Sequence, residues 1–328
     1  MLLPVRNAAA TLAVALRSVL HSRGVALEAV CVDHESTDRT SEILARLGRD
    51  GRVRIVDGRG APDVAAALER GRLHCRAPLV ARMDADDVMH PDRLAADVAW
   101  LTARPALAAV ASRCKLIPKG RTTPGLRAYV AWQNACLSIE EHAREIWIEQ
   151  PLCQPATTFR AAALEDIGGY RSGPFPEDYE LFLRLAVAGR AIEKRPALHH
   201  AWRQHARSST RFDRDALASI KAKALCARFQ LEQRAVFIAG AGKEGGRIAR
   251  ALIACGVHPQ GFLDVAERRI GRVRHGVTVL DARELPSVRT NERAFVVAAI
   301  GTSGARGVVR AQLAGAGFVE GSDCVVVA

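Results

Sequence analysis

Apolar and polar positions follow two different rhythms along the first hundred residues. Short apolar runs of strand length occur at 2–5, 29–33, 53–56 and 79–83. Stretches with apolar residues at helical spacing lie between and after them, at 11–21, 62–73 and 91–101. Ser36 or Asp38 could cap a further helix after the second run. Strands that alternate with helices predict a mostly parallel sheet with helices on both faces.

The pattern changes twice in the rest of the chain. Residues 112–160 are less regular, and helices are expected after them at 161–167, 179–187 and 214–233. The strand–helix rhythm then restarts, with strands expected at 235–239, 261–263, 294–300 and 324–327 and a helix at 246–255. A chain of 328 residues is also long for a single core. We therefore expect two α/β domains, residues 1–232 and 233–328.

Charge and cysteine content narrow the classes of function. Lys and Arg outnumber Asp and Glu by 47 to 35, which favours anionic partners. The basic residues form no run of five or six, so we expect a solvated Arg-rich surface and no nucleic-acid partner. The eight cysteines contain no Cys-x-x-Cys pair, which favours a reducing, cytoplasmic compartment. The sequence contains no apolar stretch of about 18 residues, so we predict no transmembrane helix.

The segment Asp84-Ala85-Asp86-Asp87 directly follows the fourth predicted strand. Ligands of open α/β sheets bind beyond the carboxyl ends of the strands. Neighbouring carboxylates repel one another, and their hard oxygen atoms suit Mg²⁺ or Mn²⁺. Such a cation could neutralise the diphosphate leaving group of a sugar nucleotide. Taken alone, the segment is equally compatible with a solvated acidic loop before the next helix.

A second acidic pair, Glu177-Asp178, precedes the helix expected at 179–187. Acids at a helix N-terminus can simply complement the helix dipole. A positioned carboxylate can also remove a proton from an attacking hydroxyl group. The pair alone does not decide between these two interpretations.

The motifs taken together, in their order along the chain, resemble the family 2 glycosyltransferases. They are Pro4–Ala8 with Ser18–Leu20, Asp33–Thr40, Arg82–Asp87 with Pro91–Leu94, Gly168–Tyr170 with Glu177-Asp178, and Trp202–His205 with Ser208 and Ser209. The resemblance covers about residues 1–212. It implies a GT-A fold and a nucleotide-diphosphate-sugar donor.

The resemblance also implies roles for individual residues. Asp86 and His205 would ligate the metal ion, and Asp178 would be the general base. Asp87 would have a supporting role, and His199 and His200 would be structural. The substrate-binding residues would be Pro4, Val5, Asn7, Asp33, Glu35, Arg82, Asp84, Glu177 and Arg203. Asp33 would lie near the base, Asp84 near the ribose or metal, and Arg203 at the diphosphate. His34 departs from the family pattern, which commonly has a second acid there, so the donor base stays open.

A glycine motif marks the start of the second predicted domain. Gly240, Gly242 and Gly245 have the spacing G-x-G-x-x-G after a strand and before a helix, and Asp264 ends the next strand. This context favours a Rossmann-like site for NAD or a nucleotide sugar. The segment from 261 to 280 resembles the small sugar-nucleotide-binding domain that precedes some sugar acyltransferases. No acid–base set for hydride transfer follows Asp264, so binding without redox chemistry is preferred over a domain that holds no ligand.

The sequence therefore predicts an inverting glycosyltransferase in cell-surface polysaccharide or glycoconjugate synthesis. Its acceptor would be a hydroxyl group of a saccharide or of a lipid-linked molecule, and the latter would bring the protein to the inner face of the membrane. A sugar-phosphate nucleotidyltransferase is one alternative, although Arg6-Asn7-Ala8-Ala9 is not the glycine-rich loop that such enzymes need. A non-catalytic sensor of sugar nucleotides or NAD, led by the second domain, is the other.

Overall fold

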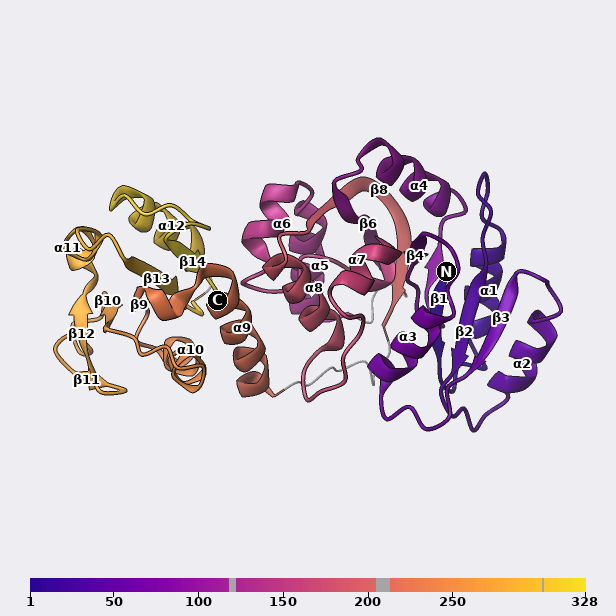
Figure 1. Ribbon diagram of the computed structural model, residues 1–328, viewed down its shortest axis with the longest axis horizontal. Helices are drawn as coiled ribbons and strands as arrows, with labels where there is room; N and C mark the ends of the chain where they lie inside the picture. The colour runs from indigo at the N-terminus through magenta and orange to yellow at the C-terminus, as the bar shows by residue number, and fades with distance from the viewer. Residues whose placement is uncertain (118–121, 205–212, 303) are drawn as a thin grey trace. The chain divides into compact units, whose positions relative to one another are not determined.

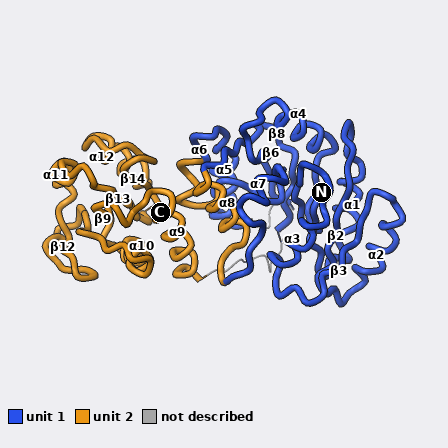
Figure 2. Tube along the Cα trace, viewed as in Figure 1, with its two compact units in different colours: residues 1–142, 151–173, 189–211 blue, residues 143–150, 174–188, 212–328 orange. Residues whose placement is uncertain are grey.

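The computed structural model describes residues 1–117, 122–204, 213–302 and 304–328. The chain divides into two compact units (Figure 2). The first unit comprises residues 1–142, 151–173 and 189–211, and the second comprises 143–150, 174–188 and 212–328. The second unit thus contains the whole glycine-motif segment together with two earlier pieces of chain. The domain boundary near residue 232 stays a prediction.

The first unit begins with the strand–helix alternation that the apolar pattern predicts (Figure 1). Its elements are β1 (Leu2–Val5), α1 (Leu12–Leu20), β2 (Ala29–Asp33), α2 (Thr40–Leu47), β3 (Val53–Asp57) and α3 (Val64–Leu73). The three strands pair in parallel in the order β1-β2-β3. Residues at helical spacing on α1, namely Leu12, Ala15, Leu16 and Val19, are fully buried. Because these apolar side chains are buried on one face, the sequence pattern predicts the helix α1.

A second sheet of the first unit has mixed strand directions. It contains β4 (Leu79–Ala81), β5 (Val88–Met89), β6 (Leu107–Ile117), β7 (Thr157–Arg160) and β8 (Ala191–Arg203), in the order β4-β7-β6-β8-β5. β6 pairs with β8 in parallel, whereas the β4·β7, β6·β7 and β5·β8 pairs are antiparallel. Register shifts near Ser112 and Arg113 interrupt the longest pairing. These bulges break the period of two, which is why the sequence pattern did not reveal β6.

The later helices of the first unit lie at the predicted positions where the sequence gives them one apolar face. α4 (Arg93–Ala103) and α7 (Ala161–Asp166) lie where helices are predicted. The less regular segment folds into α5 (Pro124–Ala135), α6 (Ile139–Glu145) and the 3₁₀ turn η1 (Gln154–Ala156). Among the described residues, no helix is both long and apolar enough to span a bilayer.

The mixed sheet covers a buried ionic network. Asp97 accepts hydrogen bonds from Thr158 Oγ1 at 2.7 Å and from Arg195 Nη2 at 2.6 Å. Arg93 Nε lies 3.6 Å from the same carboxylate, and the side chains of Arg93 and Asp97 are fully buried. Burial lowers the pKa of Arg93, although Asp97 raises it. One carboxylate therefore compensates two buried guanidinium groups.

We expect Asp97→Ala to lower the free energy of unfolding by about 3–5 kcal/mol, because it leaves two buried cations without their counter-charge. Urea titration followed by circular dichroism measures this loss. The matched control is Asp166→Ala, which removes the carboxylate of a surface ion pair. Its partner Arg190 is 45% exposed, and Asp166 itself is 49% exposed. That variant should lose less than about 1 kcal/mol. A similar small loss for both variants would contradict a structural role for the network.

The second unit is built on a six-stranded sheet. Its strands, in sheet order, are β11 (Val273–Arg274), β12 (Val277–Asp281), β10 (Gly261–Asp264), β9 (Ala235–Ala239), β13 (Ala294–Ala298) and β14 (Cys324–Val326). All neighbours are parallel except β11 and β12, which form a hairpin. The first strand, β9, thus lies between the second and fourth parallel strands, β10 and β13. A ligand crevice commonly opens at such a switch point.

Helices complete the second unit. They are α8 (Glu177–Val187), α9 (Arg214–Phe229), η2 (Leu231–Gln233), α10 (Lys243–Ala254), η3 (Ala282–Glu284), α11 (Leu285–Arg289) and α12 (Ala305–Gly315). The predicted strands and the predicted helices before and after the glycine motif are present. α12 was not expected from the sequence, and its buried residues are Val309 and Leu313.

Candidate active site

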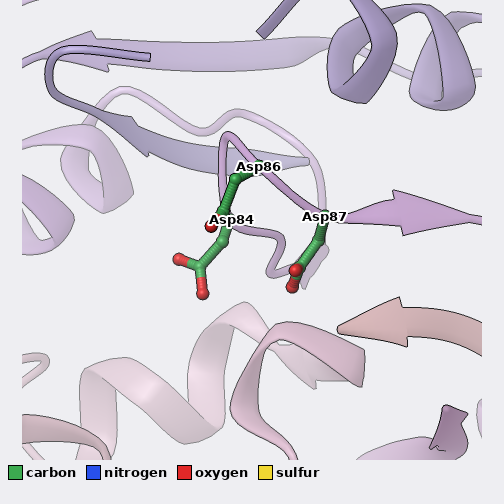
Figure 3. A group of neighbouring side chains, drawn as sticks. All are labelled: Asp84, Asp86 and Asp87. Atoms are coloured by element: carbon green, nitrogen blue, oxygen red, sulfur yellow. The ribbon is translucent and has the colours of Figure 1, made fainter. Parts of the chain in front are cut away.

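The three acidic residues Asp84, Asp86 and Asp87 lie on the loop that joins β4 to β5 (Figure 3). We call it the acidic loop. One carboxylate oxygen from each of Asp84, Asp86 and Asp87 falls within 4.8 Å of the others. Asp84 and Asp86 are half-buried, whereas Asp87 is buried. Three convergent carboxylates fit a hard divalent cation such as Mg²⁺ or Mn²⁺. The half-buried pair is the part of the cluster that a donor diphosphate could also reach.

Asp87 anchors this loop to β8. Its carboxylate accepts hydrogen bonds from His200 Nε2 at 2.8 Å and from the Arg203 backbone N–H at 2.7 Å. Arg93 Nη1 lies 3.3 Å from His200 Nδ1, and because a guanidinium only donates, Nδ1 must accept. The proton of the neutral ring is therefore on Nε2, facing Asp87. The supporting role predicted for Asp87 agrees with this geometry.

Electrostatics at this anchor follow from burial. Burial lowers the pKa of His200 well below its usual value, and Arg93 and Arg82 lower it further. Burial also raises the pKa of Asp87, and Asp84 and Asp86 add to this effect. A neutral imidazole that donates to a buried carboxyl group is a structural contact. This contact agrees with the structural role that the sequence predicts for His200, and its partner is the acidic loop itself.

Two arginines flank the acidic loop. Arg203 Nε donates to the backbone carbonyl of Asp86 at 2.7 Å, and Arg82 Nη1 pairs with the Asp84 carboxylate. The Arg82 side chain is almost fully buried. Arg82 thus contacts a carboxylate that is predicted to bind the donor, whereas Arg203 contacts the backbone of the predicted metal ligand. Arginine is well suited to hold phosphate oxygens in such a position.

The acidic loop is also tied to the start of β1 and to the residue before α1. Met83 N donates to Leu2 O at 3.1 Å, and Thr11 Oγ1 donates to Ala85 O at 3.1 Å. Ala8 N in turn donates to Thr40 Oγ1 at 2.8 Å. These contacts place the loops after β1, β2 and β4 next to one another within the first unit. The first three predicted motifs are therefore brought together.

The loops after β1 and β2 lock together through polar contacts. Asn7 Oδ1 accepts from Thr37 N at 2.8 Å, and Asn7 N donates to Ser36 Oγ at 3.1 Å. Asn7 and Glu35 both have left-handed backbones, with φ of +48° and +54°. Non-glycine residues rarely adopt this conformation, and such strain clusters at binding sites. The Glu35 carboxylate accepts from Gly60 N at 3.0 Å, which draws in the loop after β3.

The predicted substrate-binding residues of β1 and β2 differ in whether their side chains are buried in the core. Pro4 is half-buried, while the side chain of Val5 lies in the core and its carbonyl accepts from His34 N at 2.8 Å. Asp33 is half-buried at the end of β2, where its carboxylate accepts from Ser41 Oγ at 2.7 Å and from Ser36 N at 3.3 Å. Asp33 is therefore held at the edge of the parallel sheet.

His34 turns inward. Its ring is buried, and Nε2 lies 2.5 Å from Ala61 O, which can only accept, so Nε2 carries a proton. A side chain added at Gly58 would meet Asp33 O at 2.5 Å, so the same turn also requires glycine. The departure from the acidic family pattern thus serves the packing of the loop after β3.

The acid pair Glu177-Asp178 forms the first two residues of α8, which begins earlier than the predicted start at residue 179, and belongs to the second unit. Both residues are half-buried, and Asp178 Oδ1 accepts from Tyr179 N at 2.7 Å. Their substrate-binding and catalytic roles stay predictions. The predicted ligand His205, like Ser208 and Ser209, lies outside the described residues.

The glycine motif of the second unit adopts the turn that its spacing predicts. Gly240 has a φ of +103°, and a Cβ at Gly245 would lie 1.7 Å from Gly240 O. Asp264 accepts from Ala241 N at 2.7 Å and from Arg269 Nη1 at 3.0 Å. Burial raises the pKa of Asp264, but these hydrogen bonds outweigh it and hold the pKa below its usual value. The carboxylate is therefore already engaged by its own chain.

A cavity of about 490 Å³ opens beside this turn, a size typical of small-molecule sites. Gly240, Gly242 and Asp264 line it, whereas Gly245 serves only the close packing of the turn. The residues after β13 and one face of α12 form the opposite wall. We call this the glycine-motif cavity.

Sequence reasoning missed the residues that hold the acidic loop from behind. Arg93 lies in the Pro91–Leu94 motif, but the sequence predicts no role for it, for Asp97 or for Arg195. Arg93 donates to Arg82 O at 3.1 Å and to Pro155 O at 2.9 Å, which fixes the strand that leads into the acidic loop. The only signal in the sequence was an arginine and an aspartate one turn apart on a helix that is otherwise largely apolar.

Comparison with known proteins agrees with this geometry. The family described as glycosyl transferase family 2 matches residues 1–168, which is half of the chain, and the chain belongs to that family. An uncharacterized glycosyltransferase of Haemophilus influenzae is 28% identical over 137 residues, which cover 42% of this chain. The match spans 48%, about half, of that relative's length.

Solved structures establish the fold as GT-A. TarS residues 1-349 of S. aureus, in complex with UDP-GlcNAc, superimposes with a TM-score of 0.57 at 14% identity and covers 76% of this chain and 70% of its own. The mannosyltransferase PcManGT of Pyrobaculum calidifontis, in complex with GDP-Man and Mn²⁺, gives a TM-score of 0.51 at 22% identity. That match covers 70% of this chain and 62% of the mannosyltransferase. The expected family and fold are both confirmed.

Proposed function

We propose that this protein is an inverting, divalent-cation-dependent glycosyltransferase that uses a nucleotide-diphosphate-sugar donor. The observation that carries the proposal is that Asp84 and Asp86 of the acidic loop lie together with Arg82, which precedes the loop, and with Arg203, the last residue of β8. Oxygen ligands for a cation and guanidinium groups for a diphosphate thus occur together. The UDP-GlcNAc, GDP-Man and Mn²⁺ named for the two structural neighbours support it.

Each predicted site residue has a separate role in the proposed reaction. Asp86 is the metal ligand and Asp84 faces the metal or ribose, with His205 as a further ligand, and Arg203 holds the diphosphate. A bound Mg²⁺ or Mn²⁺ would neutralise the charge that develops on the leaving diphosphate. Asp178 takes the proton of the acceptor hydroxyl as its oxygen bonds to the anomeric carbon and the bond to the diphosphate breaks. Attack opposite the leaving group inverts the anomeric centre.

The wider role follows from the donor chemistry. The acceptor is a saccharide or a lipid-linked molecule, and the product enters a cell-surface polysaccharide or glycoconjugate. The enzyme works in the cytoplasm, where a lipid-linked acceptor would hold it at the inner face of the membrane. The net charge of +12 favours an anionic membrane surface.

A donor screen tests this function. The protein is heated with UDP-, GDP- and dTDP-sugars, with and without Mn²⁺, and a stabilised donor is then tested for hydrolysis or transfer. A donor at 100 times its Kd should stabilise the fold by about 2.7 kcal/mol. Product NMR reports the anomeric configuration. Release of pyrophosphate from a nucleoside triphosphate and a sugar phosphate would instead support a nucleotidyltransferase.

The second unit is proposed to bind a nucleotide sugar or NAD in the glycine-motif cavity, without redox chemistry, with its domain starting near residue 233. Two observations support binding. The cavity lies at the carboxyl ends of β9, β10 and β13, and the N-terminus of α10, which attracts phosphate, faces it through Gly242 and Lys243. Arg269 adds a cation at the same wall.

We expect Gly242→Val to weaken this binding without unfolding the protein. A Cβ at Gly242 would have only Arg269 within 4 Å, at 3.9 Å, so the side chain fits but fills the phosphate approach. Affinity for the bound nucleotide, measured by calorimetry on the full chain, should fall about tenfold or more, since one lost phosphate contact is worth at least about 1.4 kcal/mol. Gly307→Val, on α12 outside the cavity, is the matched control. Equal affinity in both variants would place the ligand elsewhere.

A further inference from the structure

A second cavity, of about 410 Å³, lies in the same unit and has a different chemical character. Its walls come from α9, α10, the start of α12 and the residues after β13 and β14. Its charged lining consists of Arg214, Lys221, Arg247, Arg306, Glu149 and Glu244. Four cationic side chains thus face two carboxylate side chains, and Ala328 also lines the cavity. We call it the basic cavity.

Lys221 forms the buried end of the basic cavity. Its Nζ donates to Ile148 O at 2.5 Å and to Val327 O at 3.2 Å, and the ammonium group has a third N–H. Among the described residues, no carboxylate lies within ion-pair distance of it. Burial lowers the pKa of Lys221 to about 8, while Glu149 and Glu244 raise it and Arg306 lowers it. A buried cation without a contacting counter-charge is costly, and a bound anion would remove that cost.

The other cations differ in how far they are already compensated. Arg247 is largely buried and pairs with Asp215 at 3.0 Å and with Glu244 at 2.6 Å. Arg214 is exposed and lies 3.7 Å from Glu244. Arg306 is exposed at the rim and makes no hydrogen bond or ion pair within the described part of the chain. Lys221 and Arg306 are therefore the two groups that a ligand anion could engage without breaking an existing pair.

The shape and the remaining lining indicate more than a single small ion. Ile148, Leu217 and Ile248 supply apolar surface between the charged groups. The volume lies in the range of sites for small organic molecules. An ammonium group and a guanidinium group together match the several oxygens and the double charge of a phosphate ester better than a single carboxylate.

We propose that the basic cavity binds a phosphate-bearing small molecule of about the size of a sugar phosphate, with its phosphate between Lys221 and Arg306. This ligand is additional to the sugar donor and to the nucleotide proposed above. The basic cavity shares Glu244 with the glycine-motif cavity, so occupation of one can influence the other. Binding in the basic cavity does not require transferase activity.

Calorimetric titration of the full chain with glucose 1-phosphate, and separately with inorganic phosphate, tests the proposal. We expect both probes to bind, the sugar phosphate more tightly, and Arg306→Gln to weaken both about tenfold, because a hydrogen bond to a charged group is lost. Lys221→Met should weaken them at least as much. Arg272→Gln, which removes an exposed arginine of the same unit outside both cavities, should leave the affinity unchanged.

Three results would overturn the assignment. Equal affinity in Arg306→Gln and Arg272→Gln would exclude the basic cavity. Loss of binding in Arg269→Gln but not in Arg306→Gln would move the phosphate to the glycine-motif cavity. Binding of malonate as tightly as of inorganic phosphate would exclude a preference for phosphate. Because Lys221 also holds two backbone carbonyls, the decision rests on Arg306→Gln, which lies at the surface.

Discussion

Asp86→Asn is expected to lower kcat/KM for donor turnover by about 10²- to 10⁴-fold, because several kcal/mol of leaving-group stabilisation depend on the cation that this carboxylate would hold. The amide keeps the size of the side chain but removes its charge. The backbone carbonyl of Asp86, which accepts from Arg203 Nε, is untouched. Donor hydrolysis measured across a Mn²⁺ titration gives the result.

Folding and metal binding can be separated in the same variant. Asp84, Asp86 and Asp87 are like charges within 4.8 Å, so removing one should leave the melting temperature without metal unchanged or slightly raised. The stabilisation that Mn²⁺ gives to the wild type should disappear. Asp92→Asn is the matched control, since its half-exposed carboxylate lies on the same stretch of chain and caps no helix through its side chain. Full, metal-dependent activity in Asp86→Asn would remove Asp86 from the metal site.

Asp178→Asn should lower kcat by about 10²- to 10⁴-fold, the usual contribution of a general base, while donor affinity and the Mn²⁺ requirement stay unchanged. The reason is that the base acts on the acceptor hydroxyl only as the new bond forms. Single-turnover transfer to the acceptor measures the chemical step, and thermal shift with the donor measures binding.

Glu180→Gln provides the control for this helix. Glu180 lies in the same first turn of α8 and pairs with Arg184 at 2.7 Å, so the variant loses a similar carboxylate and one local ion pair. It should retain kcat within about threefold, because the Glu180 carboxylate is engaged by Arg184 on its own helix. A loss of donor affinity in Asp178→Asn with kcat unchanged would make Asp178 a binding residue and leave the base unassigned.

Local patterns predicted most of the regular elements. The strands β1, β2 and β3 and the helix α1 each bury one face or both, so their apolar residues have the expected period. β6 and β8 are longer and were missed, because bulges shift their register and polar residues such as Lys194 and Arg195 are buried within β8. Apolar periodicity indicates which apolar side chains are buried. It does not indicate buried charged side chains whose partners are distant in the sequence.

By itself the sequence determined the family, the position of the acidic loop after a strand, and the glycine turn before α10. These features depend on residues close together in the chain, where steric and charge effects act locally. Only the tertiary structure decided that Asp87 is the anchor of that loop, since its partners His200 and Arg203 lie 113 and 116 residues away. It also turned His34 inward to Ala61 and placed Lys221 and Arg306 in the lining of one cavity. Burial and pairing of charged groups across such distances are properties of the folded chain, because each depends on which surfaces the fold brings together.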